Sequence, residues 1–487
     1  MNHISSNIEV LQTDIVCIGA GGTGLSAAVA AAELGAKVIV LEKRNSPGGN
    51  TARAQGFFAA ESLAQKRLNI NAPRDVLFKL SMDYSHWKVD PRIMRVFIDK
   101  SADTIRWLEA QGLPEIKEVW PLFPGQPIPT MHAPAGGGVS VTNVLVKSCE
   151  KLGVQLLYQT EPRKILTNAN GEVSGVLAVF KGKEFKILAR SVIIGTGGYG
   201  GNKELLKKYC PLYLDGILSP GLPHMGDGIR LATEIGAASE GLGNLQWLGP
   251  VFEGYAHGPG IWKDPVMIWI NKKGERFADE VSGYNHFESV HAVLRQPGRI
   301  SYSVFDESIK RNIDERIEKG QLRFRGLSNR PPSAAKPDFT QDLRLEAEKG
   351  KVKITDSWDD MALWMGANPE VLKSTINEYN SSCDSGHDEV FAKEVKYLLP
   401  LRTPPYYAMR CHPIFLTTIG GIKINYRMEV LNREDDPIRG LYAGGNDTGG
   451  WEPENCYNAF LSAHAFGFAI NSGRMAGENA AQYVSRK

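Results

Sequence analysis

The sequence predicts an α/β fold in which a mostly parallel sheet carries a nucleotide-binding loop and a further domain is inserted into the later part of the chain. Three observations lead to this prediction: a strand–helix–strand pattern near the start, recurrent glycine clusters, and a change of composition after about residue 245. The chain has 487 residues, of which 42% are apolar, so it can bury more than one hydrophobic core. We therefore expect two or three domains.

The strand–helix–strand pattern lies in the segment TDIVCIGAGGTGLSAAVAAAELGAKVIVLEK, residues 13–43. Uninterrupted apolar runs at Ile15–Ile18 and Val38–Leu41 predict two buried parallel strands. The alanine-rich stretch from about Gly24 to Leu34 predicts the helix that connects them. The segment is thus expected to form one βαβ unit.

The turn before this helix fits the pattern G-x-G-x-x-G, with Gly19, Gly21 and Gly24 at the glycine positions. In this pattern the glycines allow a tight turn, a close approach of the backbone to a pyrophosphate, and close packing of helix on strand. The phosphates lie at the helix N-terminus, where free N–H groups favour anions. Glu42, 18 residues after Gly24, can accept hydrogen bonds from ribose hydroxyls.

A second glycine loop, SPGGNTARAQGFFAA at residues 46–60, follows the acidic strand end directly. An enzyme that binds a nicotinamide dinucleotide would usually begin another helix at this point. The second loop therefore favours FAD over NAD.

With these motifs the chain resembles the FAD-dependent oxidoreductase 2 family, which contains the flavoprotein subunits of fumarate reductase and succinate dehydrogenase and the 3-ketosteroid dehydrogenases. The motifs, in the family's order, are GAGGTG at 19–24, GGNT at 48–51, GTGG at 195–198, GDGI at 226–229, GERF at 274–277, TTIGG at 417–421 and GLYAGGN at 440–446. The resemblance implies a two-dinucleotide-domain-type flavoprotein with a Rossmann-like FAD domain and an inserted α+β capping domain.

The resemblance also implies the cofactor and its contacts. Members that bind flavin covalently carry a histidine where this chain has Asn50, so FAD should be bound non-covalently. The last helix, expected to begin near Phe460, would point its N-terminus at the flavin and stabilise the negative charge of the reduced form. The implied cofactor-binding residues are Gly19, Gly21, Gly22, Thr23, Gly24, Glu42, Gly49, Asn50, Thr51, Gly56, Thr196, Gly197, Asp227, Asn446, Leu461 and Ser462.

The domain organisation follows from the same reading. Residues 172–198 predict a β-meander that returns to a buried strand at Val192–Ile194. From about residue 245 the composition shifts toward charged and aromatic residues with helical stretches. We expect the first part of the FAD-binding domain at 1–244, the capping domain at 245–410, and the second part of the FAD-binding domain at 411–487.

The substrate positions depart from those of fumarate reductases, which clamp a dicarboxylate with arginine and histidine. Counted from GERF, the proton-donating arginine of that pattern falls on Tyr284; the histidine before TxGG falls near Leu416 or Thr417, and a clamping arginine falls on Phe460. Two buried carboxylates would be costly without cations. The resemblance thus predicts a hydrophobic substrate, either steroid-like or an aromatic α,β-unsaturated carbonyl compound.

Tyr284, Tyr457 and His132 are the candidates for catalysis, and His286 is a residue that could tune Tyr284. Tyr284, in SGYNHFE, would exchange a proton with the substrate, provided that a neighbouring donor lowers its pKa. His286 could tune this tyrosine if the two lie on one strand, where residues two apart share a face. Tyr457 could polarise a substrate carbonyl, and His132, in MHAPAGGGVS, lies in a glycine loop that is near the substrate in relatives. Arg276 of GERF is expected to support the fold of the cap.

Three functions remain open from the sequence. The first is reduction, or reverse formation, of a C=C bond conjugated to a carbonyl, with an external electron donor or acceptor. The second is a hydratase or isomerase that holds FAD without net redox change. The third is a fumarate-reductase-like enzyme for a small unsaturated acid.

Composition argues against several other classes. The net charge of +2 comes with no basic block, so a nucleic-acid partner is not expected. The six cysteines are far apart without a CxxC pair, which gives no signal for a zinc site or an iron–sulfur cluster and fits reduced thiols in the cytoplasm. The first ten residues lack the features of a signal peptide, and no segment approaches 18 consecutive apolar residues, so we expect neither export nor an integral membrane segment.

Overall fold

The computed structural model describes residues 9–121, 123, 126–255, 260–322, 324, 326–327, 338–454, 457–458 and 460–486. It divides into two compact units. The first unit comprises residues 1–213, 221–246 and 417–487, and the second comprises residues 214–220 and 247–416. The second unit thus includes a short segment, 214–220, that composition does not separate from its neighbours.

A six-stranded sheet forms the centre of the first unit, in the order β19–β20–β11–β2–β3–β7. Its strands are β2 (Ile15–Ile18), β3 (Val38–Leu41), β7 (Gln155–Leu157), β11 (Ser191–Ile194), β19 (Glu429–Leu431) and β20 (Pro437–Ala443). All pairs are parallel except β19–β20. Strands β2, β3 and β11 are buried along their whole length, as expected for apolar runs covered on both faces.

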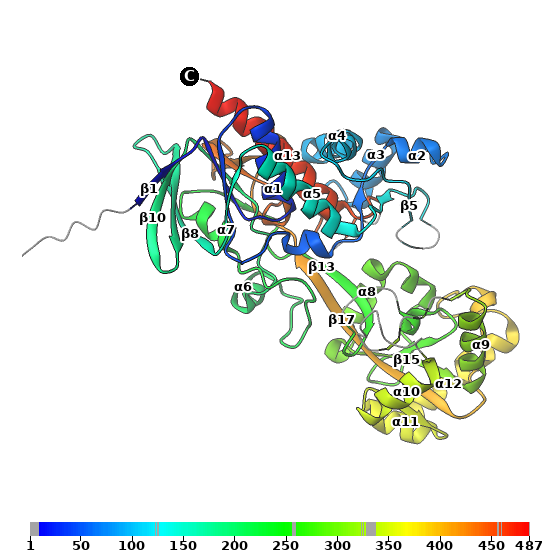
Figure 1. Cartoon of the computed structure of the whole chain (residues 1–487). Coiled ribbons are helices and arrows are strands. Elements are labelled where there is room, and N and C mark those ends of the chain that lie inside the picture. The colour runs from blue at the N-terminus through cyan, green and yellow to red at the C-terminus, as the bar shows by residue number, and fades with distance from the viewer. Residues whose placement is uncertain are drawn as a thin grey trace, which may run out of the picture. The chain divides into compact units, whose positions relative to one another are not determined.

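Two helices far apart in the sequence pack together on this sheet. α1 (Gly22–Glu33) follows β2, and α13 (His464–Ser485) is the last helix of the chain. Figure 1 shows the two helices side by side, and their contact is extensive. Most residues of α1 have small side chains, which allows α13 to approach it closely. The end of the chain therefore completes the nucleotide-binding unit formed by its beginning.

Smaller elements surround this core. A second sheet, in the order β1–β10–β9–β8, contains the meander, and two short sheets have the orders β12–β18 and β4–β6–β5. Their strands are β1 (Glu9–Gln12), β4 (Phe57–Phe58), β5 (Val119–Trp120), β6 (Met131–His132), β8 (Thr160–Thr167), β9 (Val173–Phe180), β10 (Lys183–Leu188), β12 (Ser239–Glu240) and β18 (Gly421–Ile422). The remaining α-helices of the first unit are α2 (Leu63–Arg67), α3 (Arg74–Tyr84), α4 (Pro91–Ala110), α5 (Gly137–Lys151), α6 (Lys203–Tyr209) and α7 (Asp227–Thr233).

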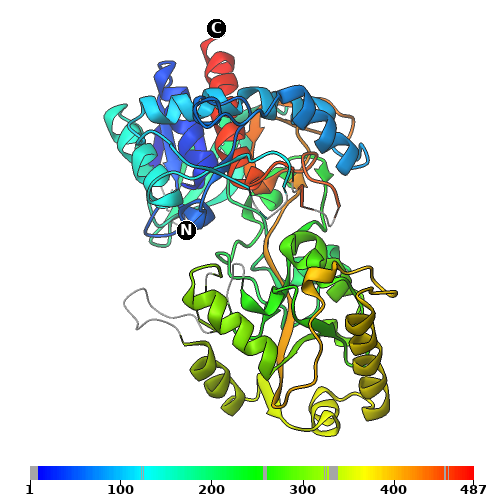
Figure 2. The same cartoon turned by 90° about the vertical axis from the view of Figure 1, so that its right-hand side faces the viewer.

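The second unit is built around an antiparallel sheet with the order β13–β17–β15–β14, and β16 pairs with β17. The strands are β13 (Leu245–Phe252), β14 (Ile268–Ile270), β15 (Ser301–Asp306), β16 (Val352–Thr355) and β17 (Tyr406–Thr418), of which β17 is the long orange strand in Figure 2. The α-helices are α8 (His286–Leu294), α9 (Glu307–Glu318), α10 (Phe339–Glu348), α11 (Trp358–Met365) and α12 (Pro369–Ser385). The 3₁₀ helices of the chain are η1 (Gly49–Arg53), η2 (Ile261–Lys263), η3 (Glu280–Tyr284), η4 (Pro297–Arg299), η5 (Val395–Tyr397) and η6 (Gly445–Asp447).

Arg276 of the GERF motif lies in a buried network of charges in the second unit. Its guanidinium donates to both carboxylate oxygens of Glu280, at 2.9 and 2.8 Å, and to Asp388 at 2.7 Å. Lys393 Nζ is also paired with Glu280, at 3.0 Å. Burial is tolerable here because every charge has an opposite partner. The network supports the expected role of this arginine in folding the cap.

Several expected elements occur as predicted. The strands Ile15–Ile18 and Val38–Leu41 have the expected bounds, and the meander returns to β11. The start of the last helix is different: it begins at His464 and not near Phe460. The reason is local, because Ala463 has φ +61° and therefore interrupts right-handed helical geometry directly before His464.

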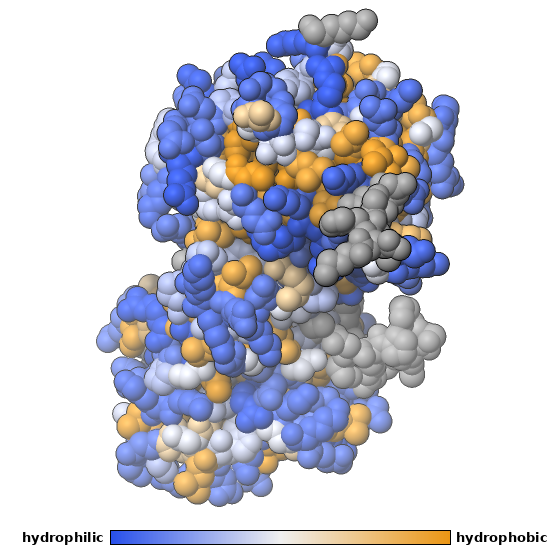
Figure 3. Space-filling view, turned by 90° about the vertical axis from the view of Figure 1, so that its left-hand side faces the viewer, coloured by the Kyte–Doolittle hydropathy of each residue, from blue (hydrophilic) through white to orange (hydrophobic). Residues whose placement is uncertain are grey.

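The surface seen in Figure 3 is dominated by hydrophilic residues, with one larger apolar area on the first unit. Exposed apolar side chains of the meander sheet include Val10, Phe180 and Leu188. Among the described residues, none of the helices combines the length and the apolar character that crossing a bilayer requires.

Candidate functional site

The turn between β2 and α1 forms the base of the predicted nucleotide site. Gly21 precedes the helix, and the Gly22 N–H donates to Thr51 Oγ1 at 3.0 Å. A side chain at Gly24 is impossible, because its Cβ would lie 1.8 Å from the Gly19 carbonyl oxygen. Thr23 is buried at the same end of the helix. This end presents backbone N–H groups and a positive helix dipole to a phosphate.

Glu42 is held at this turn by backbone hydrogen bonds. Its Oε2 accepts from the Ala20 N–H at 2.9 Å, and its Oε1 accepts from the Arg44 N–H at 2.8 Å. The Gly48 N–H donates to the Ala20 carbonyl at 2.7 Å, which joins the second glycine loop to the first. The carboxylate is thus placed where the sequence predicts contact with a ribose.

The second glycine loop continues into η1, which contains Gly49, Asn50 and Thr51. Asn50 Oδ1 accepts from the Leu222 N–H at 2.8 Å, so this loop is tied to the segment before α7. Gly56 follows η1 and lies against the backbone carbonyl of His132. Gly49 and Thr51 of this loop therefore lie close to the turn before α1.

Asp447 was given no role by the sequence, yet it shapes the GTGG loop. Its side chain is fully buried, with Oδ1 accepting from Thr196 Oγ1 at 2.9 Å and from the Gly198 N–H at 3.0 Å, and Oδ2 accepting from the Gly197 N–H at 2.7 Å. Burial raises the pKa of this carboxyl, while the hydrogen bonds oppose that rise. The sequence feature that could have pointed to Asp447 is its position directly after Asn446, the last residue of the GLYAGGN motif.

Asn446 provides a test of whether the site suits FAD. Its Nδ2 donates to Thr417 Oγ1 at 3.1 Å, whereas its buried Oδ1 has no hydrogen-bond partner among the described residues. An unpaired buried acceptor needs a donor, and the hydroxyl groups of FAD are donors of this kind. Together with the N-terminus of α1 and the Glu42 carboxylate, this oxygen fits the cofactor.

Asp227, which the family resemblance implies as a cofactor contact, forms an ion pair within the protein. It is the first residue of α7, and its carboxylate forms an ion pair with Lys43, directly after Glu42. The Gly228 N–H donates to Thr196 Oγ1 at 3.0 Å, so the start of α7 is also attached to the GTGG loop. A direct bond from Asp227 to FAD stays a prediction.

Leu461 and Ser462 precede the last helix and do not belong to it. The Ser462 N–H donates to Thr130 Oγ1 at 3.0 Å, and the Gln126 amide donates to Ser462 Oγ at 2.6 Å. Both residues are fully buried. The turn before α13 is therefore fixed by the segment that leads into β6.

A buried pair, Glu452 and His464, lies at the start of α13. His464 Nε2 contacts the Glu452 carboxyl, and His464 Nδ1 bonds the Leu461 carbonyl at 2.9 Å. Burial raises the pKa of Glu452, and the adjacent imidazole opposes this rise. The ring of Tyr457 lies 4.3 Å from that of His464, between centroids. Burial also raises the pKa of Tyr457, so its hydroxyl stays protonated and can donate a hydrogen bond.

His132 is a packed histidine in strand β6. Its Nδ1 bonds the Thr130 carbonyl at 2.9 Å, and its Nε2 bonds Ser62 Oγ at 2.6 Å. Burial lowers its pKa to about 4, so the ring is neutral at neutral pH. Both nitrogens are engaged within the protein, which favours a structural role over proton transfer.

Tyr284 ends η3, and His286 begins α8, so the two residues do not share a strand. The Tyr284 hydroxyl bonds the Tyr397 hydroxyl at 3.2 Å. Burial is the main cause that raises the pKa of Tyr284, and the hydrogen bond to Tyr397 is the second cause. The expectation of a lowered pKa is therefore wrong. His286 is half-buried, and desolvation, followed by the charge of Lys263, lowers its pKa well below the ordinary value.

Lys263, in η2, was not singled out from the sequence. Its side chain is buried, and Nζ has no hydrogen-bond partner among the described residues. Burial lowers its pKa to about 7, partly opposed by the Cys411 thiol. A periodic apolar pattern does not reveal such a lysine, since only the tertiary structure removes it from water.

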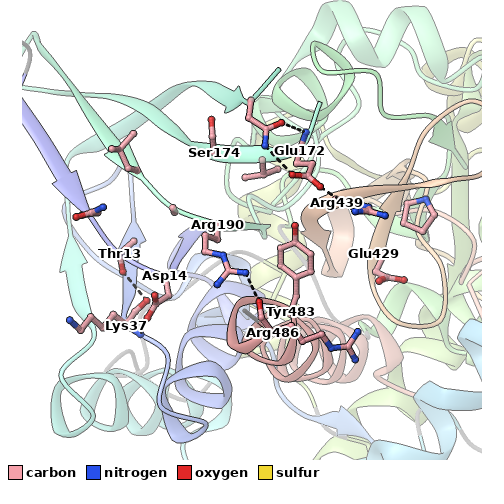
Figure 4. Close-up of a pocket in the computed structure, with 16 residues that line it drawn as sticks. Thr13, Asp14, Lys37, Glu172, Ser174, Arg190, Glu429, Arg439, Tyr483 and Arg486 are labelled. Carbon is pink, nitrogen blue, oxygen red and sulfur yellow. Dashed lines mark hydrogen bonds and ion pairs between the residues drawn. The ribbon is translucent and has the colours of Figure 1, made fainter. Parts of the chain in front are cut away.

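A hollow of about 1220 Å³ on the first unit is a separate feature, shown in Figure 4. Its lining includes Asp14, Lys37 and Arg190, which directly precede strands β2, β3 and β11. Ligands of open α/β sheets bind at the carboxyl ends of the strands, whereas this hollow lies at the amino ends. It is therefore not the FAD site.

Comparisons with known proteins agree with this geometry. The sequence model of a family described as "FAD binding domain" matches residues 14–455. The vinyl phenol reductase of Lactiplantibacillus plantarum is 31% identical over an alignment that covers 97% of this chain and 97% of that protein. The fumarate reductase (cytochrome) of Shewanella frigidimarina is 30% identical, with 97% of this chain and 78% of that protein covered.

Two solved structures are similar over almost the whole chain. The open conformation of a flavocytochrome c3 fumarate reductase aligns with a TM-score of 0.74 at 25% identity, covering 97% of this chain and 79% of that one. A 3-ketosteroid-delta4-(5alpha)-dehydrogenase from Rhodococcus jostii aligns with a TM-score of 0.76 at 23% identity, covering 99% of each chain. The second likeness concerns the fold alone.

Proposed function

The chain belongs to the FAD binding domain family, and from this premise we propose that it reduces, or in reverse forms, a C=C bond conjugated to an aromatic ring or a carbonyl in a hydrophobic substrate. It is an FAD-dependent oxidoreductase of the C=C reductase and dehydrogenase type. When bound, FAD supplies the hydride chemistry. Around it, the residues of this chain bind the cofactor and substrate and transfer the proton.

The observation that carries the proposal is the neutral character of the positions that clamp carboxylates in the family pattern. Phe460 packs edge-on against the ring of Tyr84, with centroids 5.6 Å apart. Thr417 accepts a hydrogen bond from Asn446 and donates to the Thr418 carbonyl. Neither position offers a cation to a dicarboxylate, which would be costly to bury unpaired. A phenyl or steroid-like group suits such walls better.

The likeness to vinyl phenol reductase supports an aromatic substrate, because it extends over nearly the full length of both proteins. We propose Tyr284 as the group that transfers the proton. The phenol is protonated through the neutral range, as in any tyrosine, and can therefore donate a proton, while the pKa raised by burial makes it a weaker acid than an ordinary tyrosine. Tyr397, bonded to it at 3.2 Å, would return the proton.

A second candidate, reduction of a small unsaturated acid, is favoured by the likeness to the Shewanella fumarate reductase. The neutral substitutions make it the weaker alternative. For either reaction we propose an external electron donor or acceptor as a partner. We also propose the cytoplasm as the compartment, since the five cysteines in the described ranges are free thiols.

The experiment that tests the proposal follows the flavin spectrum under anaerobic conditions. The protein is photoreduced and then mixed with a vinyl phenol or with fumarate. We expect the oxidised flavin spectrum to return rapidly with the vinyl phenol and, because neither Thr417 nor Phe460 offers a cation to a dicarboxylate, about a hundredfold more slowly with fumarate.

Two results would contradict the proposal. Faster oxidation by fumarate would establish the small-acid reaction instead. Conversion of the vinyl phenol without any change in the flavin spectrum would establish a non-redox hydratase or isomerase.

A further inference from the structure

His224 is a partly buried histidine in the first unit that the family motifs do not include. It lies two positions before the GDGI motif. The imidazole edge formed by Nδ1, Cε1 and Nε2 faces the Gly197 backbone: a Cβ at Gly197 would lie 2.9 Å from Cε1, 3.1 Å from Nε2 and 3.2 Å from Nδ1. Gly197 has φ +90°, so a larger residue is disfavoured there on two grounds. The ring and the GTGG loop thus fit against each other.

The same ring contacts the second glycine loop. His224 Nδ1 lies 3.5 Å from Asn50 Nδ2, and Asn50 Oδ1 accepts from the Leu222 N–H at 2.8 Å. The family resemblance implies that both Asn50 and Gly197 contact the cofactor. His224 therefore lies between two of the loops that form the FAD site.

Backbone hydrogen bonds on both sides fix the position of His224. Its carbonyl accepts from the Gly201 N–H at 2.8 Å, and the Gly226 N–H donates to the Gly198 carbonyl at 3.0 Å. The Asn202 amide donates to the Met225 carbonyl at 3.1 Å. A ring held by its flanking backbone loses little further freedom when a ligand binds it.

The charges around His224 keep its ring neutral. Burial lowers its pKa to about 4, and the nearby cations Lys43 and Arg44 act in the same direction, whereas Asp227 acts against them. A neutral imidazole carries one N–H donor and one acceptor nitrogen. Because the Asn50 amide nitrogen can only donate, Nδ1 is the acceptor nitrogen that faces it, and the Nε2–H group is left as a donor toward a carbonyl or ring nitrogen of the cofactor.

We propose that His224 is a cofactor-binding residue of this site, whose imidazole, held beside Asn50 and against Gly197, forms a hydrogen bond with bound FAD. The proposal rests on FAD as the cofactor and is independent of which substrate is reduced. The sequence gives no signal for it, because the residue lies in a loop and meets its partners only through the tertiary structure.

The test compares His224→Leu, which removes both nitrogens, with His224→Asn, which keeps one short amide. The control is His86→Asn, at an exposed histidine of the same unit. FAD affinity is measured by fluorescence titration of the stripped protein, and the absorption bands of the bound flavin are recorded. Loss of one hydrogen bond should raise the Kd of His224→Leu about fivefold to tenfold and shift the bands, with a smaller change for His224→Asn.

An unchanged Kd and an unchanged flavin spectrum in a folded His224→Leu protein would overturn the proposal and leave His224 as a packing residue. Folding is checked by circular dichroism. Should His224→Leu not fold, the comparison is made between His224→Asn and His224→Gln, with unchanged values in both again overturning it. A wild-type protein that binds FAD but ignores the vinyl phenol would contradict the proposed function and leave this result unaffected.

Discussion

Asp447 in the first unit and Lys263 in the second are both buried ionisable groups, but their surroundings differ. The Asp447 carboxyl accepts three hydrogen bonds, from Thr196 and from the backbone of Gly197 and Gly198. Lys263 Nζ has no hydrogen-bond partner within the described part of the chain. The Asp447 carboxyl is thus fully hydrogen-bonded within the fold. The charged form of Lys263, by contrast, lowers the stability of the protein because its burial is not compensated.

The difference teaches that burial alone does not define a role. The second unit is able to pair a buried cation, as it does for Arg276 with Glu280 and Asp388. An unpaired lysine in the same unit is therefore a feature that packing does not require. Asp447 belongs to the opposite class, since its oxygens accept hydrogen bonds from the GTGG loop, which we propose contacts the cofactor.

Tyr284 lies between these cases, because its hydroxyl is bonded to another phenol. Tyr284→Phe is expected to keep bound FAD and to lose about 10²- to 10⁴-fold in turnover, the usual contribution of a general acid. Steady-state kinetics and the flavin spectrum measure the two effects. The control is Tyr302→Phe, which removes a hydroxyl that donates to the Met365 carbonyl in the same unit. Unaltered turnover in Tyr284→Phe would remove this tyrosine from the mechanism.

Lys263→Met replaces the unpaired amine by an apolar side chain of similar size. The pKa of Lys263 is lowered to about 7 in the folded protein, so the unfolded chain binds the proton more readily. The wild type should therefore gain stability as the pH rises from about 7 to about 10, and the variant should lose this dependence. At pH 7 the variant should be more stable by on the order of 4 kcal/mol.

Urea titrations across this pH range measure the effect, with Lys319→Met at an exposed position as the control. A destabilised Lys263→Met protein would show that the amine has a partner that stabilises its charge. A gain in stability combined with a loss of turnover would identify the lysine as a functional group.

Asp447→Ala tests the buried group whose hydrogen bonds are all formed within the protein. It leaves three donors without their acceptor, so FAD affinity should fall roughly a hundredfold through distortion of the GTGG loop. Asp447→Asn, which keeps one acceptor oxygen, should lose less. Fluorescence titration with FAD measures both Kd values. If both variants bound FAD like the wild type, the carboxyl would have no part in shaping the site.

The last prediction concerns the attachment of the flavin, which is measured by acid precipitation of the flavin-loaded protein. Because Asn50 occupies the position of the linking histidine in covalent relatives, the FAD should be released completely into the supernatant. A yellow pellet would indicate a covalent link. His224, whose Nδ1 lies 3.5 Å from Asn50 Nδ2, would then be the imidazole to examine by peptide mapping.

The sequence predicted the parts of the site that depend on local patterns. The strands on either side of α1, the glycine turn and Glu42 were readable because period, turn chemistry and helix N-termini act within about 30 residues. Asp447 was missed because its partners lie 249 to 251 residues away in the chain. The start of α13 was misplaced because Ala463 has a left-handed conformation that alanine rarely adopts, which the sequence does not signal.

The central sheet places β2, from the first twentieth of the chain, beside β11, and β11 beside β20 near the end. The GTGG loop that follows β11 is bound by Asp447, which lies close to the end of the chain. Synthesis has to pass β20 and Asp447 before this part of the sheet and the loop after β11 can be completed, so we expect a polypeptide that stops before residue 437 to lack a complete cofactor site.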